Sequence, residues 1–227
     1  MRFALIHSPL VGPYTWALVA EALVRRGIRA VVPDLQAQVE AGKPYWAQHA
    51  SAVARALAPA ADSEAVVLVG HSGAGMLLPA CRERLGHPVV GYIFVDAGIP
   101  EDGKSRLDLF ENREAVAAFR QAAGGGCLPA WTSDDLKDVI PDVIVRERFV
   151  WELRPTPLAV YEEPLPVFQG WPDAPGGYLH FSAVYDSAAA RARRMGWAYR
   201  KIDAGHFHML VEPEAVAAAL VELAQQM

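Results

Sequence analysis

The chain has 227 residues, of which 52% are hydrophobic, and its formal net charge is −5 at pH 7. This composition supplies a substantial core for one α/β domain. The mild negative charge offers no basic surface for a nucleic acid, and no apolar stretch reaches the roughly 20 residues of a membrane span. The two cysteines are widely spaced, which excludes a disulfide framework and a metal-ligand cluster and favours a reduced, cytoplasmic setting.

The first 98 residues alternate short apolar runs with amphipathic segments. The runs predict strands at residues 3–6, 28–32, 66–69 and 89–95, and the amphipathic segments predict helices at residues 14–26, 45–58 and 73–85. This alternation favours a parallel sheet with right-handed crossovers. Ligands of such a sheet bind at the carboxyl ends of the strands, where we expect His7, Asp34, Ser72 and Asp96.

Between residues 99 and 171 the alternation stops, and the sequence predicts helices near residues 113–123, 133–139 and 141–153. We interpret residues 99–171 as a lid inserted over the strand ends. Its aromatic residues Trp131, Trp151 and Tyr161 are candidates for an apolar substrate pocket. The alternative for each of them is a place in the core of the lid itself.

The sheet resumes after the insertion. A strand is predicted at residues 178–185, a helix at 187–195, a strand at 197–202 and a last helix from Glu212-Pro213. We therefore expect an α/β core formed by residues 1–98 and 172–227, with a mainly parallel sheet of about six strands. The sequence does not separate a monomer from a homodimer.

The segment Val66–Met76 reads V-V-L-V-G-H-S-G-A-G-M and contains the candidate nucleophile Ser72. Gly70 and Gly73 permit a sharp turn that leaves the hydroxyl exposed. The pattern G-x-S-x-G is typical of such a turn between a strand and a helix, and here Ala74 takes the place of its last glycine. An ordinary loop is the alternative for this motif when it is considered by itself.

A serine hydroxyl needs a base that accepts its proton. His206 is the strongest candidate, because it follows Gly205 at the end of the last strand, on the edge where Ser72 is expected. The order nucleophile, acid, histidine along the chain is the order expected for this kind of fold.

Several motifs together resemble the α/β-hydrolase superfamily over nearly the whole chain. They are His7-Ser8-Pro9 followed by Trp16, Pro33-Asp34-Leu35, Gly70-His71-Ser72-Gly73-Ala74, and Gly205-His206-Phe207-His208 ahead of Glu212-Pro213. The resemblance implies a hydrolase fold that acts without a cofactor. The chain starts at the strand that precedes the superfamily's His-Gly motif, so the sheet is expected to be reduced.

The resemblance also implies where the third catalytic group lies. The acid usually follows the strand before the last helix–strand unit, where Asp186 stands. Asp96, at the end of the preceding strand, is the alternative that some members use. Of the two, Asp186 is favoured, and the other role considered for Asp96 is to cap the loop at residues 97–100.

The expected oxyanion hole departs from the superfamily pattern. One donor is the backbone N–H of Gly73, and the usual second donor position is taken by Pro9, which has no N–H. Three alternatives remain open: Leu10 donates after a shift of the loop, the Ser8 hydroxyl substitutes, or the hole has one donor fewer.

These motifs predict a cofactor-independent serine hydrolase that acts on a small or medium apolar ester, thioester or lactone through an acyl-enzyme on Ser72. Its expected partner is a small-molecule substrate, with no metal, nucleic acid or membrane. Pro9 motivates a first alternative, a lyase, cyclase or dehydratase on the same fold. A catalytically weak member that only binds a ligand is the second alternative.

Overall fold

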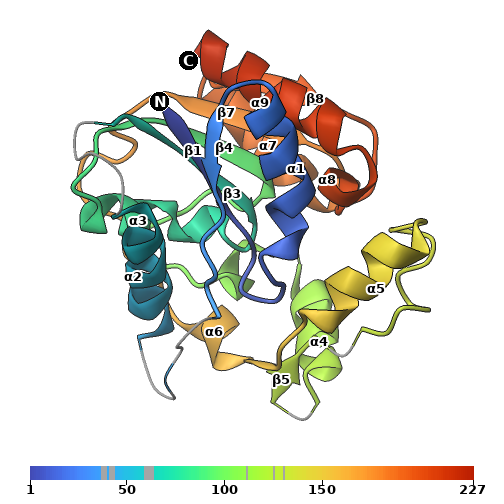
Figure 1. Cartoon of the computed structure of the whole chain (residues 1–227). Coiled ribbons are helices and arrows are strands. Elements are labelled where there is room, and N and C mark those ends of the chain that lie inside the picture. Colours follow the sequence, from blue (N-terminus) through green and yellow to red (C-terminus); the bar gives the residue numbers. More distant parts are fainter. Residues whose placement is uncertain (37–39, 41–43, 59–63, 111, 125, 130) are drawn as a thin grey trace.

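The computed structural model describes residues 1–36, 40, 44–58, 64–110, 112–124, 126–129 and 131–227. A six-stranded sheet in the order β2-β1-β3-β4-β7-β8 forms its centre, and every neighbouring pair is parallel (Figure 1). The bounds are β1 Arg2–Ile6, β2 Arg29–Val31, β3 Val66–Ser72, β4 Val89–Ala97, β7 Gly176–His180 and β8 Ala198–Lys201. The predicted parallel sheet of about six strands is therefore confirmed.

The helices cover both faces of the sheet. Helices α1 (Tyr14–Arg25), α8 (His208–Val211) and α9 (Pro213–Gln226) pack on one face, and α2 (Tyr45–Leu57), α3 (Leu78–Arg84) and α7 (Asp186–Arg194) pack on the other. Strand β1 shows why its sequence is continuously apolar. Its successive side chains alternate between the two cores, Phe3 and Leu5 on one side and Ala4 and Ile6 on the other.

Residues 99–171 lie at the carboxyl ends of the strands (Figure 1). They contain η2 (Leu107–Leu109), α4 (Arg113–Ala122), β5 (Cys127–Leu128), α5 (Val143–Trp151), β6 (Thr156–Pro157) and α6 (Ala159–Glu162), with β5 and β6 paired antiparallel. The helix predicted at residues 133–139 is wrong, because the chain forms turns there. Its backbone hydrogen bonds are mostly those of single turns, from the N–H of Lys137 to the carbonyl oxygen of Asp134 and from that of Val139 to Leu136.

Two glutamates of this inserted segment cap helices of the core. Helices α1 and α2 begin after Pro13 and Pro44, which supply no side-chain cap. Glu152 Oε2 accepts the backbone N–H of Tyr14 at 2.7 Å, at the start of α1. Glu163 accepts the first two N–H groups of α2, at 2.8 and 2.7 Å. Each carboxylate satisfies donors that a helix end leaves open, so the two glutamates fasten the insertion to the core.

Two boundaries near the strand ends differ from the prediction. Strand β7 stops at His180, a 3-10 turn η3 (Ala183–Tyr185) follows, and Asp186 is the first residue of α7. The helix after the serine starts with a 3-10 turn η1 (Gly75–Leu77) before α3.

None of the helices in the described part of the chain has the length and apolar character that a membrane span requires.

Candidate active site

Ser72 is the last residue of β3 and has a φ of 57°, in the left-handed region that serine rarely adopts. The glycines around it allow the chain to reverse this sharply. A Cβ on Gly70 would lie 3.0 Å from the backbone nitrogen of Gly75, and a Cβ on Gly75 would lie 2.3 Å from the carbonyl oxygen of Gly98. The backbone therefore holds Ser72 in a strained conformation, a feature that clusters at functional sites.

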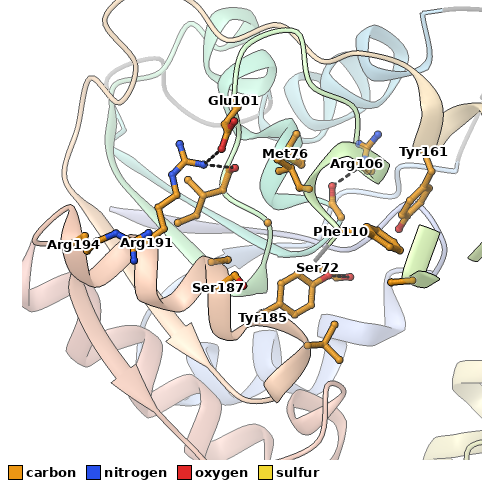
Figure 2. Close-up of a pocket in the computed structure, with 17 residues that line it drawn as sticks. Ser72, Met76, Glu101, Arg106, Phe110, Tyr161, Tyr185, Ser187, Arg191 and Arg194 are labelled. Atoms are coloured by element: carbon orange, nitrogen blue, oxygen red, sulfur yellow. Dashed lines mark hydrogen bonds and ion pairs between the residues drawn. The ribbon is translucent and has the colours of Figure 1, made fainter. Parts of the chain in front are cut away.

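Ser72 lies on the wall of a cavity of about 520 Å³ (Figure 2), a volume typical of small-molecule sites. The wall is mostly apolar, and it includes Met76, Ile99, Leu109, Phe110, Val184 and Ala188. Tyr161 and Tyr185 add hydroxyl groups, and the charged residues Glu101, Arg191 and Arg194 also line the cavity. Residues between Ile99 and Tyr161 and residues after β7 thus line this cavity together with Ser72.

Asp96, which is fully buried, contacts His206, whose side chain is 27% exposed. Oδ2 of Asp96 lies 2.7 Å from Nδ1 of His206 and accepts the Ser182 hydroxyl at 2.6 Å. Oδ1 accepts the backbone N–H groups of Phe181 and Ser182 at 3.0 and 2.9 Å. Burial opposes ionisation, but these hydrogen bonds and the charge of His206 outweigh it and lower the pKa of Asp96. The carboxylate thus fixes Nδ1 as the protonated nitrogen and leaves Nε2 free to act as a base.

A β-bulge aims Asp96 at the histidine. His71 pairs with Val95 and Ser72 pairs with Ala97, so Asp96 is the extra residue of β4 between them. Its φ of 43° is left-handed, like that of Ser72. Bulges commonly redirect a side chain beside an active site. Here the irregularity places the acid on the strand next to the one that carries the serine.

The acid favoured from the sequence, Asp186, is corrected by this geometry. Its side chain is 63% exposed, and its Oδ1 lies 3.2 Å from Nε2 of His180. Because β7 ends at His180 and η3 follows, Asp186 becomes the first residue of α7 and does not reach His206. Asp96, the alternative, makes the contact.

The ring of His206 is held between two other rings. The Tyr185 ring stacks on it with centroids 5.4 Å apart and planes at 17°, and the His71 ring lies 4.4 Å away on a 34° tilt. Nε2 of His71 donates to the carbonyl oxygen of His206 at 3.0 Å. Burial, followed by the charge of His206, holds the pKa of His71 well below its ordinary value. His71 is therefore neutral, and its hydrogen bond holds the backbone of His206 in place.

Tyr185 also contacts Ser72, and sequence reasoning missed it. Its hydroxyl lies 3.1 Å from Oγ of Ser72. Burial raises the pKa of the phenol, which therefore remains protonated. The sequence placed Tyr185 inside a strand, and it belongs to no motif. Its only signal is its position, a few residues beyond the strand next to β4.

The residues expected at the oxyanion hole differ in their hydrogen-bond partners. The N–H of Gly73 has no acceptor among the described residues. The N–H of Leu10, expected as the second donor, points instead at Oγ of Ser8, 3.4 Å away. That same Oγ lies 3.0 Å from the hydroxyl of Tyr161. The carbonyl of Pro9 is fixed by Gln36 and Thr156.

Of the three aromatic residues proposed for the pocket, Tyr161 lines the cavity, whereas Trp131 and Trp151 do not. Trp151 ends α5 and is 72% exposed, with the guanidinium of Arg148 4.6 Å above its ring. Trp131 is 36% exposed and touches Phe207 from outside. The expectation for these two tryptophans is corrected, since both face solvent. Among the described residues, no group of three or more histidine, cysteine or acidic side chains is arranged to hold a metal ion.

A serine on a strained turn after a central parallel strand, together with an aspartate–histidine pair at the carboxyl ends of the same sheet, is typical of the α/β-hydrolase architecture. Comparison with known families agrees. The profile described as "Alpha/beta hydrolase family" matches residues 4–219, and the chain belongs to this family.

The most similar proteins that we compared extend this result. The chain is 26% identical over 248 aligned positions to the "Carbendazim hydrolyzing esterase" of Nocardioides sp. (strain SG-4G), covering 98% of this chain and 99% of that one. An esterase of Oryza sativa subsp. japonica is 34% identical over 112 residues, 45% of this chain and 41% of that one. Among solved structures, an extracellular alpha/beta-hydrolase from a Paenibacillus species superposes with a TM-score of 0.79 at 21% identity, covering 98% of both chains. A methylesterase from Arabidopsis gives 0.72 at 16% identity over the full length of both chains.

Proposed function

We propose that the protein hydrolyses a carboxylic ester through an acyl-enzyme on Ser72. The observation that carries this proposal is Ser72 itself, strained on its turn at the wall of the cavity and hydrogen-bonded to Tyr185, whose ring stacks on that of His206. Relatives named as esterases support the reaction class.

In this mechanism, Oγ of Ser72 attacks the acyl carbon while Nε2 of His206 takes the hydroxyl proton. The carbonyl electron pair moves onto oxygen, and the N–H of Gly73 stabilises the resulting charge. The tetrahedral intermediate then expels the alcohol, which receives the proton from His206. Water, activated by the same histidine, attacks the acyl-enzyme and releases the acid. Asp96 keeps the imidazole in one tautomer and stabilises its protonated form throughout.

The cavity indicates the kind of substrate. Its volume of about 520 Å³ and its largely apolar wall suit a small or medium apolar ester, thioester or lactone. Residues 99–171 serve as a lid in this proposal, because Leu109, Phe110 and Tyr161 of that segment line the cavity. Solved structures with a similar fold are described as a pyrethroid hydrolase and a methylesterase, which supports an ester as the substrate class.

A fluorophosphonate probe tests the proposal. We expect one covalent adduct on the intact protein, localised to Ser72 by peptide mass spectrometry and missing from Ser72→Ala. A panel of acyl esters should be turned over by the wild type and by neither Ser72→Ala nor His206→Ala. A wild-type protein that shows no adduct, under conditions that label a control serine hydrolase, would refute the mechanism.

One observation favours a second candidate, a lyase, cyclase or dehydratase that uses Ser72 and His206 only for proton transfer. Pro9 removes a backbone donor that acyl transfer uses, and Leu10 does not replace it because its N–H points at Ser8. A quenched reaction separates the two candidates. An acylated Ser72 peptide supports ester hydrolysis, and turnover of a non-ester substrate without any acyl adduct supports the second candidate.

A further inference from the structure

We propose that the hydroxyl of Tyr161 is the second oxyanion donor of this site and replaces the backbone N–H that Pro9 lacks. The inference rests on the proposed ester hydrolysis and names a residue that the mechanism above did not use. It assigns a side chain of the inserted segment to the reaction centre.

The need for a donor follows from the loop after β1. The N–H of Gly73 is free among the described residues, so one side of the oxyanion site is open. On the other side Pro9 has no N–H, and Leu10 directs its own N–H at Oγ of Ser8. An oxyanion held by one N–H alone is poorly stabilised, since loss of a single donor typically slows acyl transfer about 10²- to 10³-fold.

Two hydrogen bonds connect the loop after β1 to the hydroxyl of Tyr161. The N–H of Leu10 donates to Oγ of Ser8 at 3.4 Å, and Oγ of Ser8 lies 3.0 Å from the hydroxyl oxygen of Tyr161. Because Ser8 already accepts from Leu10, its own proton is available for Tyr161. In this proposal Ser8 is the donor and the Tyr161 oxygen accepts, which leaves the Tyr161 proton to point into the cavity that Tyr161 lines and Ser8 does not. Linked hydroxyls polarise one another and become better donors.

The position of Tyr161 suits this role. A Cβ on Gly73 would lie 2.7 Å from its hydroxyl oxygen, so the hydroxyl stands directly over the residue that supplies the first donor. A side chain at position 73 would collide with it, which gives the glycine a second purpose. In Figure 2 the Tyr161 side chain points toward Ser72 from α6.

Arg106 fixes this arrangement and adds charge. Its Nε donates to the carbonyl oxygen of Gly73 and its Nη1 to that of Val160, both at 2.8 Å. One buried guanidinium therefore links the turn after Ser72 to α6. Its carbon Cζ lies 5.6 Å from the centre of the Tyr161 ring. The fixed positive charge of Arg106 near the phenol favours an oxyanion that accepts a hydrogen bond from Tyr161. Burial raises the pKa of Tyr161, so the phenol retains the proton that it must donate.

Tyr185 is a weaker candidate for the same role, although it also lines the cavity. Its hydroxyl is bonded to Oγ of Ser72, the attacking atom, and its ring stacks on His206. It therefore stands on the side of the base. An oxyanion donor belongs beside Gly73, where Tyr161 lies.

Steady-state kinetics on an ester that the wild type hydrolyses test the proposal. We expect Tyr161→Phe to lower kcat about a hundredfold and to leave KM within about threefold, because the donor acts on the oxyanion and not on the bound ester. A trifluoromethyl ketone, whose adduct with Ser72 carries an oxyanion, should bind Tyr161→Phe weaker by a similar factor. Tyr14→Phe, remote from the cavity, is the matched control. In the Tyr161→Phe background, Pro9→Ala returns the missing N–H and should recover part of the lost kcat.

Different failures are distinguishable. A wild type without turnover and without a fluorophosphonate adduct overturns the proposed function itself. An active wild type with Tyr161→Phe unchanged in kcat and in ketone affinity overturns only this inference, as does a variant in which KM alone changes. If Tyr161→Phe does not fold, Ser8→Ala removes the middle of the chain of hydrogen bonds and should lower kcat about tenfold. An unchanged kcat in Ser8→Ala overturns the inference as well.

Discussion

Oδ2 of Asp96 lies 2.7 Å from Nδ1 of His206, although the two residues are 110 positions apart in the chain. Asp96 has no exposed surface, and among the described residues its carboxylate bonds to the segment after β7 and to His206. The pair therefore joins the ends of β4, β7 and β8 at one point. That point is where a histidine must be oriented if it is to serve Ser72.

The first prediction separates the two candidate acids. Asp96→Asn should reduce kcat about a thousandfold or more, because an amide can no longer hold Nδ1 as the protonated nitrogen or stabilise the imidazolium. Asp186→Asn, whose carboxylate contacts His180 at the surface, should remain within about twofold of the wild type. The measurement is ester hydrolysis, with circular dichroism of each variant as the folding control. An equal loss in both variants would contradict the assignment.

The sequence predicted the fold, and it predicted that Ser72 and His206 follow strand ends, because these features depend on local signals. Apolar runs marked the strands, and the glycines around Ser72 marked the turn that its φ of 57° requires. His206 followed a strand and a glycine. Such features involve neighbouring residues, so they can be recognised in one chain without knowledge of the others.

The acid could not be chosen in the same way. Its identity depends on a one-residue bulge in β4 and on the end of β7 at His180, and both are properties of strand register. The predicted strand at residues 178–185 ran too far and placed Asp186 at the strand end. The contacts of Tyr161 with Ser8 and of Tyr185 with Ser72 join residues more than 100 positions apart, and no periodicity announces them.

A second prediction concerns Tyr185. Its hydrogen bond to Ser72 lowers the reactivity of the serine, whichever hydroxyl donates. A phenol that donates occupies a lone pair of the serine oxygen. A phenol that accepts holds the serine proton that His206 would have to remove. Tyr185→Phe keeps the ring stacked on His206 and removes this bond. A neutral hydrogen bond is worth about 1 kcal/mol net, so fluorophosphonate labelling should become about fivefold faster. Slower labelling would show instead that the phenol assists Ser72.

A third prediction tests how the inserted segment is fastened to the core. Glu163→Ala removes the acceptor of the N–H groups of Tyr45 and Trp46 and should lower the free energy of unfolding by about 2 kcal/mol. Glu162→Ala, next in the chain, loses only an exposed ion pair with Arg120 and should change it by less than about 0.5 kcal/mol. Urea denaturation of both variants provides the comparison. Equal stabilities would mean that solvent replaces Glu163 without cost.

A fourth prediction concerns stability at mildly acidic pH. Burial lowers the pKa of His7, His49 and His71 from the ordinary value of 6.5, to about 3 for His49, and it acts in the same direction on the half-buried His208. Below pH 6.5 these histidines therefore bind protons in the unfolded chain but not in the folded chain. The free energy of unfolding is highest above pH 6.5 and declines as the pH falls. Asp96 does not contribute to this decline. Its pKa is lowered from 3.8, so the stability that it adds is lost only at more acidic pH.

The expected size follows from the same linkage. Each fully excluded proton costs about 1.4 kcal/mol per pH unit, which gives about 2 kcal/mol for His49 alone at pH 5. Urea denaturation at pH 7.5, 6.5 and 5.0 measures the decline, and His49→Gln should make it shallower by about that amount while its stability at pH 7.5 serves as the reference. A wild-type stability that stays constant from pH 7.5 to pH 5.0 would show that these buried imidazoles take up protons without cost, and His49→Gln would then follow the wild type at every pH.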